Sequence, residues 1–313
     1  MNKLYLVIPC YNEEEVLPET TKRLKEKMGT LMKKKKIAKD SKVIFVNDGS
    51  KDRTWELITQ YHQTDSLFGG INLSRNRGHQ NALLAGLMTV YEDCDMVISM
   101  DADLQDDINV IDQFVEAYEQ GHDVVYGVRS SRKTDTFFKK NTALMFYRFM
   151  KLMGVDIVYN HADYRLMSKR AIAALSEFKE VNLFLRGLVP LVGYSHTTVE
   201  YERSERFAGE SKYPLKKMLN FAFDGITSFS VKPIRLITIA GFIVFVISIL
   251  MLLYSLIRHI MGDTIVGWTS VMTSVWLLGG FQILSIGIVG EYVGKIYLES
   301  KERPRFIIES YLK

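Results

Sequence analysis

The chain has 313 residues, of which 47% are hydrophobic, and a formal net charge of +4. This length and apolar content allow one large domain or two smaller ones with a substantial core. The modest charge argues against nucleic-acid binding, because the basic residues gather beside two long apolar stretches, where they fit anionic lipid headgroups. The two cysteines, Cys10 and Cys94, are expected to be small core residues of a cytoplasmic domain.

The first 128 residues alternate apolar strand patterns with helical patterns. Strands are expected at 4–9, 42–47, 70–73, 95–101 and 123–128, and helices at 17–36, 52–64, 78–91 and 108–119. Such alternation predicts an α/β fold in which helices cover both faces of a mostly parallel sheet. Ligands of these sheets bind beyond the carboxyl ends of the strands.

Polar and acidic side chains follow three of the expected strands, in segments 9–13, 47–50 and 101–103. Asp101 and Asp103 come directly after an apolar strand, and buried carboxylates are costly unless they are paired or bind a metal. The pair therefore indicates a divalent cation that would also hold phosphates, although capping of the following turn is the alternative. The sequence contains neither a dinucleotide-binding glycine motif after the first strand nor a P-loop.

Beyond Val128 the pattern becomes irregular. Segment 137–153 is expected to be a helix, either in the membrane interface or packed in the ordinary way. For Asp163, the alternative to a functional role is a turn residue ahead of a helix at 168–174.

Two stretches without charged residues, 236–257 and 264–290, are each longer than the roughly 20 residues that a helix needs to cross a bilayer. We expect two transmembrane helices rather than a buried helix pair. Basic residues flank the stretches on the outer sides, so the positive-inside rule places both ends in the cytoplasm and the loop from 258 to about 266 outside. The first residues have no signal-peptide layout, which also keeps the amino-terminal part cytoplasmic.

The segments 9–13, 47–52, 73–80 and 101–105 together resemble family 2 glycosyltransferases. With segments 163–166 and 206–212 and the two apolar stretches, the whole chain is similar to the polyprenyl-phosphate glycosyltransferases, the group of bactoprenol glucosyltransferase and dolichol-phosphate mannose synthase. Two residues depart from the family pattern: Arg77 stands in place of an aromatic residue and Ala162 in place of a glycine, so the sugar preference stays open.

The resemblance implies a GT-A fold, a nucleotide-sugar donor such as UDP-glucose, Mg²⁺ or Mn²⁺, and a polyprenyl phosphate acceptor such as undecaprenyl phosphate. It also implies a multi-pass enzyme of the bacterial cell membrane that forms a homo-oligomer such as a tetramer. The donor-binding residues by this resemblance are Pro9, Tyr11, Glu13, Asp48, Asp101, Asp103 and Gln105. Asp103 would ligate the metal with Asp101 beside it, and Asp101, Asp103 and Asp163 are the candidate catalytic residues.

The acceptor phosphate requires cationic partners, for which arginine has the best geometry. The candidates are Arg129, Arg132, Arg165, Arg206 and Lys212. Because a phosphate monoester already carries a nucleophilic oxygen at neutral pH, Asp163 acts either as a base or only to orient the substrates. Gly209 would let the loop around it close over the donor.

The expected organisation is a GT-A domain over 1–210, an interfacial helix over 211–233, two spans over 234–294 and a cytoplasmic tail over 295–313.

Three other functions compete with a UDP-hexose transferase. One is a mannose synthase that uses GDP-mannose. The second is a processive polysaccharide synthase, whose Gln-x-x-Arg-Trp segment is missing here. The third is an inactive sugar-binding or scaffold protein, which the retained carboxylates Asp48, Asp101, Asp103 and Asp163 disfavour.

Overall fold

The computed structural model describes residues 1–129, 161–181, 183–202, 227, 230, 232–261 and 267–313. The first part contains β1 (Leu4–Cys10), α1 (Leu17–Lys33), β2 (Lys42–Asn47), α2 (Thr54–Thr64), β3 (Phe68–Leu73), α3 (His79–Val90), β4 (Met96–Ser99), α4 (Ile111–Glu119) and β5 (Val124–Arg129). The second part contains β6 (His161–Ser168), α6 (Lys169–Ser176), α7 (Leu185–Leu191), β7 (His196–Tyr201), α9 (Lys232–Ile260), α10 (Trp268–Ser300) and β8 (Ile308–Leu312).

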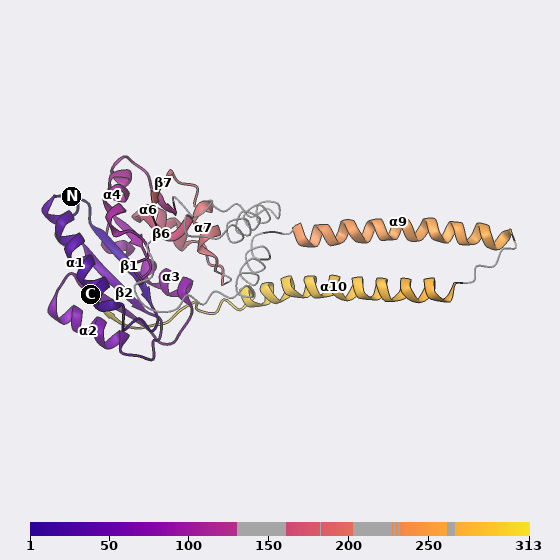
Figure 1. Cartoon of the computed structure of the whole chain (residues 1–313), viewed down its shortest axis with the longest axis horizontal. Coiled ribbons are helices and arrows are strands. Elements are labelled where there is room, and N and C mark those ends of the chain that lie inside the picture. The colour runs from indigo at the N-terminus through magenta and orange to yellow at the C-terminus, as the bar shows by residue number, and fades with distance from the viewer. Residues whose placement is uncertain (130–160, 182, 203–226, 228–229, 231, 262–266) are drawn as a thin grey trace.

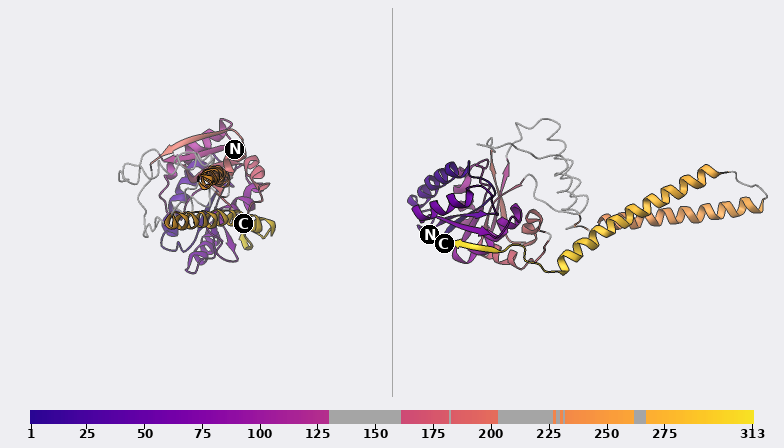
Figure 2. Two further views of the ribbon diagram at one scale, coloured as in Figure 1. Left: turned by 90° about the vertical axis from the view of Figure 1, so that its right-hand side faces the viewer. Right: turned by 90° about the horizontal axis from the view of Figure 1, so that it is seen from below.

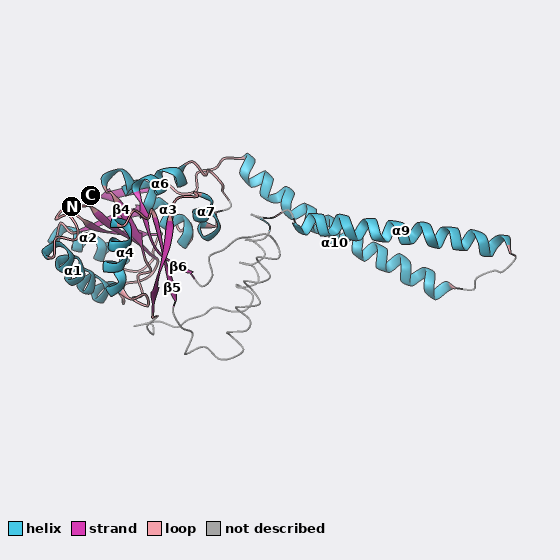
Figure 3. Ribbon diagram, turned by 90° about the horizontal axis from the view of Figure 1, so that it is seen from above, coloured by secondary structure: helices cyan, strands magenta, loops and turns pink. Residues whose placement is uncertain are grey.

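The strands that the structure describes form one sheet in the order β7-β5-β6-β4-β1-β2-β3-β8. β1 pairs in parallel with β2 and β4, and β2 pairs in parallel with β3. Alternate residues of β1 enter different cores: Leu6 packs with the residues of α1 and α4, whereas Val7 packs with those of α3 and α6. Helices therefore cover both faces of the sheet, as Figure 3 shows. The predicted α/β fold with a mostly parallel sheet is confirmed.

Several element ends differ from the sequence expectations. α1 ends at Lys33 rather than at residue 36, and β4 ends at Ser99, so Asp101 lies in the following loop. The helix expected from residue 108 begins with a short 3₁₀ turn and becomes α-helical at Ile111. These shifts are local, because strand and helix ends depend on tertiary hydrogen bonds that residue patterns do not encode.

The segment around Asp163 is a strand, so the alternative reading of Asp163 as a turn residue is wrong. β6 runs antiparallel between β4 and β5, with Arg165 paired to Ser99 of β4 and to Tyr126 of β5. Hydrogen bonds to two neighbouring strands hold this segment extended. The helix after it is present as α6, and the Ser168 side chain caps it by accepting a hydrogen bond from the backbone N–H of Ala171 at 3.1 Å. The expected helix at 137–153 and the interfacial helix lie outside the described residues, apart from Thr227, Ser230 and the first residues of α9.

α9 and α10 form an antiparallel pair that projects away from the sheet (Figures 1 and 2). Many of their apolar side chains are exposed, including Ile283 at 73% and Ile286 at 71%. Within the described ranges, no helix meets the length and hydropathy that a membrane crossing requires. The two predicted spans are therefore not confirmed.

After α10 the chain returns to the sheet, a connection that the sequence patterns do not predict. β8 pairs antiparallel with the outer edge of β3, and the Ser74 N–H donates to the Ile307 carbonyl at 3.0 Å. Between α10 and β8, the Arg305 guanidinium donates to the Phe178 carbonyl at 3.0 Å, and at the end of α10, Glu299 accepts from the Val181 N–H at 2.8 Å. The end of the chain thus joins the long helices to the sheet domain.

Gly49, in the turn after β2, provides a test of how tightly the loops at this sheet edge pack. Its φ is +63°, and a Cβ atom there would lie 2.5 Å from the Asn76 nitrogen. We expect Gly49→Ala to lower the free energy of unfolding by about 2 kcal/mol or more, because left-handed strain and a backbone clash add up.

Gly121→Ala is the matched control, since Gly121 has a φ of +96° but no atom within 4 Å of the position that a Cβ would take. Gly121→Ala should lower the free energy of unfolding only by the cost of the backbone conformation, about 1 kcal/mol. Thermal or urea unfolding of the purified proteins measures both. Equal losses in the two variants would show that the Asn76 loop yields to the methyl group.

Candidate active site

The sheet gathers functional side chains at one edge. The carboxyl ends of β1, β2, β4, β5 and β7 lie there, together with the amino end of antiparallel β6. This arrangement brings together residues from distant parts of the sequence, namely Asp48, Asp101, Asp103, Arg129, Asp163 and Tyr201. The predicted convergence of acidic strand ends therefore holds, and β6 adds Asp163 to it.

The loop from Asp101 to Asp107, called the acidic loop below, follows β4. It turns back at Leu104, whose φ is +55°, and the Gln105 N–H donates to Asp103 Oδ1 at 3.2 Å. Asp103 is nearly buried, whereas the Asp101 side chain is 37% exposed. Desolvation and the neighbouring charges of Asp163 and Asp103 raise the pKa of Asp101, against the effect of His79. Asp101 is thus a carboxylate that a cation would stabilise.

Three hydroxyl groups hold the acidic loop from different elements. The Thr20 hydroxyl of α1 donates to the Ala102 carbonyl at 2.8 Å, and the Tyr164 phenol of β6 donates to the Asp107 carbonyl at 3.1 Å. The Tyr201 phenol of β7 donates to Asp106 Oδ1 at 2.5 Å. Burial and the charge of Asp101 raise the pKa of Asp106 to about 6, although the bond from Tyr201 opposes this shift.

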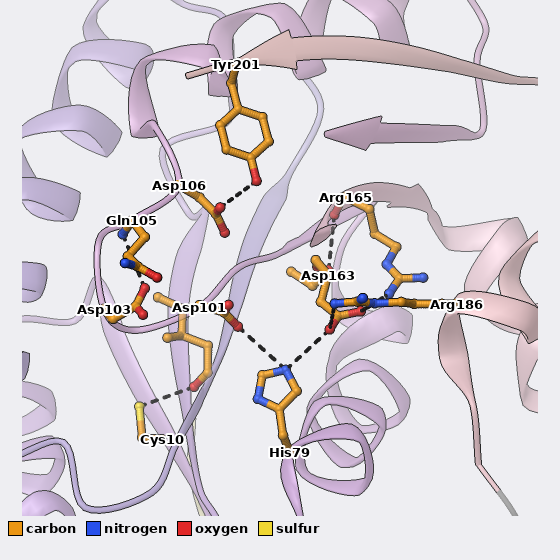
Figure 4. Close-up of polar contacts among 12 residues, drawn as sticks. Cys10, His79, Asp101, Asp103, Gln105, Asp106, Asp163, Arg165, Arg186 and Tyr201 are labelled. Atoms are coloured by element: carbon orange, nitrogen blue, oxygen red, sulfur yellow. Dashed lines mark hydrogen bonds and ion pairs between the residues drawn. The ribbon is translucent and has the colours of Figure 1, made fainter. Parts of the chain in front are cut away.

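Asp163 lies between two arginines, as Figure 4 shows. Its Oδ1 accepts from Arg165 Nη2 at 2.7 Å and from Arg186 Nε at 3.2 Å, and its Oδ2 accepts from Arg186 Nη2 at 3.1 Å. Burial opposes ionisation of Asp163, but the charges of Arg186 and Arg165 outweigh it and hold the pKa of this carboxyl below its ordinary value. Asp163 is consequently ionised and fully paired by its neighbours.

Arg186, which lies on α7, is a site residue that the sequence patterns do not single out. It is the charged residue within the otherwise apolar or glycine-containing segment 183–191. A lone charge in an apolar helix is the signal that would have identified it, because such a charge requires a partner. Its side chain is 30% exposed, whereas the Arg165 side chain is only 2% exposed.

His79, the first residue of α3, connects the two acidic groups of the site. Its Nε2 lies 3.5 Å from Asp101 Oδ1 and 3.8 Å from Asp163 Oδ2 (Figure 4). The imidazole is 44% exposed. A protonated His79 would lower the repulsion between these two carboxylates.

Several of the predicted donor-binding residues lie at the ends of β1 and β2. Both oxygens of Asp48 accept backbone N–H groups, from Arg77 at 2.7 Å and Gly78 at 2.9 Å. Burial raises the pKa of Asp48 despite these hydrogen bonds. Each oxygen keeps a second lone pair, so the predicted role of Asp48 in donor binding stays a prediction.

The segment after β1 is tied to the segment after β2. Ser50 Oγ accepts from the Asn12 N–H at 3.0 Å, and Asn12 Oδ1 accepts from the Lys51 N–H at 2.8 Å. The Glu13 N–H donates to Thr54 Oγ1 at 2.9 Å, while Tyr11 projects outward and is 43% exposed. Pro9 is buried within β1, and Gln105 is half-buried on the acidic loop.

The predicted acceptor residues divide into two groups. Arg129 ends β5 at the same sheet edge, half-buried, and Arg165 directs its guanidinium at Asp163 and, at 3.4 Å, at the Leu185 carbonyl. The other three, Arg132, Arg206 and Lys212, lie outside the described residues.

Among the described side chains, no group of three or more histidine, cysteine, aspartate or glutamate residues is arranged to hold a metal ion. Mg²⁺ and Mn²⁺ nevertheless bind through one or two carboxylates when substrate phosphates supply further oxygens. Asp101 and Asp103 fit this requirement, because they share one loop and the pKa of Asp101 is raised by burial and neighbouring negative charge. The site thus fits a cation that binds together with a diphosphate.

The two arginines of Asp163 should differ in their effect on stability. Arg165→Met leaves a buried carboxylate with one arginine fewer, and we expect a loss of about 3 kcal/mol or more in the free energy of unfolding. Arg186→Met removes a partly exposed partner and should cost about 1 kcal/mol. Urea unfolding of the two variants at neutral pH measures the difference. A larger loss for Arg186→Met would contradict the assigned burial.

Comparisons with known proteins agree with this architecture. The family model described as Glycosyl transferase family 2 matches residues 5–175, and the GtrB C-terminal hairpin matches residues 232–296. The chain is 53% identical to the uncharacterized glycosyltransferase YkoT of Bacillus subtilis (strain 168), over 98% of this chain and 91% of the relative. It is 40% identical to the bactoprenol glucosyl transferase of Shigella phage SfX, over 98% and 99% of the two chains.

Among solved structures, glucosyl-3-phosphoglycerate synthase from Mycobacterium tuberculosis, in complex with Mn²⁺, UDP and phosphoglyceric acid, is similar with a TM-score of 0.44 and 14% identity. That match covers 72% of this chain and 76% of the synthase. The family match and the identity to relatives over nearly the whole chain show that this protein belongs to glycosyl transferase family 2.

Proposed function

We propose that this glycosyltransferase moves a hexose from a UDP-sugar, such as UDP-glucose, to a polyprenyl phosphate at the cytoplasmic face of the membrane, with inversion at the anomeric carbon. The observation that carries the proposal is the meeting of the acidic loop with Arg129 and the Asp163–Arg186 pair at one sheet edge. The phage relative named bactoprenol glucosyl transferase, which matches essentially the whole chain, supports a polyprenyl acceptor.

The donor side of the site consists of the segments after β1 and β2 and the acidic loop. Tyr11, Glu13 and Asp48 would contact the nucleoside, and Asp101 and Asp103 would face the diphosphate. A Mg²⁺ or Mn²⁺ ion held by these two carboxylates would supply charge stabilisation for the departing nucleoside diphosphate. The chain's own contribution is to fix the two carboxylates through the contacts of Thr20 and Tyr164 with the acidic loop.

The acceptor requires no general base, because a phosphate monoester is already ionised at neutral pH. The lowered pKa of Asp163 makes it a weak base, and both of its oxygens already accept bonds from arginines. We therefore assign Asp163 the role of orienting Arg186. The partly exposed Arg186 and Arg129 would bind the acceptor phosphate, and buried Arg165 would keep Asp163 in place.

The membrane part of the proposal rests on α9 and α10. Their exposed apolar side chains, such as Phe242, Leu250 and Ile283, have no counterpart of comparable extent on the part of the sheet domain that the structure describes. Apolar surface of this extent favours lipid contact. An attached hairpin would keep the site beside a lipid acceptor, with the sheet domain in the cytoplasm.

The first test is enzymatic. Purified protein with Mg²⁺ or Mn²⁺ is expected to form a lipid-linked sugar from undecaprenyl phosphate and one radiolabelled donor among UDP-glucose, UDP-galactose, UDP-N-acetylglucosamine and GDP-mannose. EDTA should stop the reaction. Asp103→Asn should lower the rate about a hundredfold or more, because the metal loses a charged ligand.

Asp107→Asn is the matched control on the same loop, because the Asp107 side chain caps the backbone N–H of Asn109 at 2.8 Å and an asparagine oxygen accepts the same bond. It should keep most of the activity. A product only from GDP-mannose would replace the UDP-hexose assignment by a mannose synthase. No lipid-linked product from any donor, with the acceptor verified, would refute the transferase proposal for polyprenyl phosphate.

The second test concerns the hairpin. Membranes from expressing cells are washed with alkaline carbonate, and we expect the wild-type protein to stay in the pellet. Replacing both Ile283 and Ile286 with aspartate should release a large part of it, because each charge in lipid costs about 2.5–3.5 kcal/mol. The double alanine variant at the same positions is the control and should stay. Complete release of the wild type would refute hairpin attachment.

A further inference from the structure

The hydrogen bond between Tyr201 and Asp106 is a contact that the proposed reaction does not use directly. Asp106 is 3% exposed and Tyr201 is also 3% exposed, so the pair is screened from water. The Tyr201 hydroxyl donates to Asp106 Oδ1 at 2.5 Å, and Oδ2 has no hydrogen-bond partner in the part of the chain that the structure describes. The hydrogen bond from Tyr201 thus links the Asp106 carboxylate to strand β7 of the sheet (Figure 4).

Tyr201 also contacts the acceptor side of the site. β5 and β7 pair in parallel with Arg129 directly opposite Tyr201, so their side chains are cross-strand neighbours. Burial alone would lower the pKa of Arg129, but its contact with Tyr201 and the charge of Asp106 raise it. One phenol therefore lies between a carboxylate of the acidic loop and an arginine at the end of β5.

The surrounding packing fixes the position of this phenol. The Tyr201 ring contacts Tyr164 edge to face, with ring centroids 5.4 Å apart, and Tyr164 packs in turn on Phe114 with centroids 4.7 Å apart. Gly127 of β5 makes room for both tyrosines, since a Cβ atom there would lie 2.8 Å from the Tyr164 carbonyl and 3.1 Å from Tyr201 Cε1. The tyrosine ring is thereby held in one place, and its hydroxyl defines where Asp106 sits.

We infer that Tyr201 is a positioning residue that couples the acidic loop to Arg129, and thereby sets the distance between the donor diphosphate and the acceptor phosphate. The inference rests on the proposed function for the identity of the two ligands. Asp106 lies three residues after Asp103 on the acidic loop, so a displacement of Asp106 is passed on to the carboxylates that face the donor. The same displacement moves the charge of Asp106 away from Arg129 at the acceptor side.

The experiment compares Tyr201→Phe, Asp106→Ala and the double variant with Tyr5→Phe. Tyr5 is the matched control, because it is 1% exposed but lies on β1 one residue from its amino end, far from the acidic loop. The measurements are kcat, KM for undecaprenyl phosphate, and calorimetric binding of UDP in the presence of Mn²⁺. Thermal unfolding of each variant reports whether it folds.

Tyr201→Phe and Asp106→Ala should each weaken UDP binding and raise KM for the lipid phosphate, with kcat/KM about tenfold lower, as for the loss of a hydrogen bond to a charged group. The double variant should be no worse than either single one, because both remove the same contact. Asp106→Asn retains an oxygen that accepts from Tyr201 and should restore most of the activity. A purely structural role would lower kcat with the active fraction and leave KM and UDP affinity unchanged.

The inference is overturned if Tyr201→Phe binds UDP and the lipid phosphate as Tyr5→Phe does, or if the effects of the two single variants multiply in the double variant. Its failure is distinct from failure of the proposed function. The latter shows as absence of any lipid-linked sugar from the wild type, whereas UDP binding with Mn²⁺ is measured without the acceptor.

Discussion

The crowding of carboxylates at one sheet edge is the constraint on which the rest of the site depends. Asp101, Asp103, Asp106 and Asp163 meet there, and like charges at short range cannot all be ionised without partners. The fold resolves the conflict differently for each. Two arginines neutralise Asp163, a buried phenol holds Asp106, and His79 lies beside the partly exposed Asp101. A cation held by Asp101 and Asp103, as we propose, would offset the remaining negative charge of the loop.

The pairing of Asp163 with two arginines also bears on the role that we propose for it. A carboxylate with a lowered pKa and two arginine partners is suited to holding cations in place and poorly suited to accepting a proton. A phosphate nucleophile needs the former property and not the latter. The surroundings of Asp163 favour the orienting role that we propose over that of a base, because Arg165 from the same strand β6 and Arg186 from α7 both bind it.

The parallel half of the sheet follows from sequence patterns, because its signals are local. β1 to β4 are short apolar runs that end in polar turn residues, and parallel pairing then places Asp48 and Asp101 at the same edge. Asp163, Arg186 and Tyr201 belong to a different case. Their positions depend on β6 entering the sheet antiparallel and on β7 pairing with β5, and such long-range choices leave no periodic trace in the local sequence. In β7 the alternation of exposed and buried residues covers only a few positions. Gly127 leaves room for the Tyr201 ring, but nothing in the local sequence distinguishes it from other strand glycines.

The pairing of β8 with β3 has a consequence for the order in which the molecule is completed. β8 follows α10 in the chain, so the outer edge of β3 stays open until both long helices have been synthesised. An open strand edge is a template for pairing with other chains. During synthesis, the free edge of β3 can therefore pair with other chains until the two helices have emerged. Fast folding of the helical pair would favour correct pairing of β3 with residues 308–312.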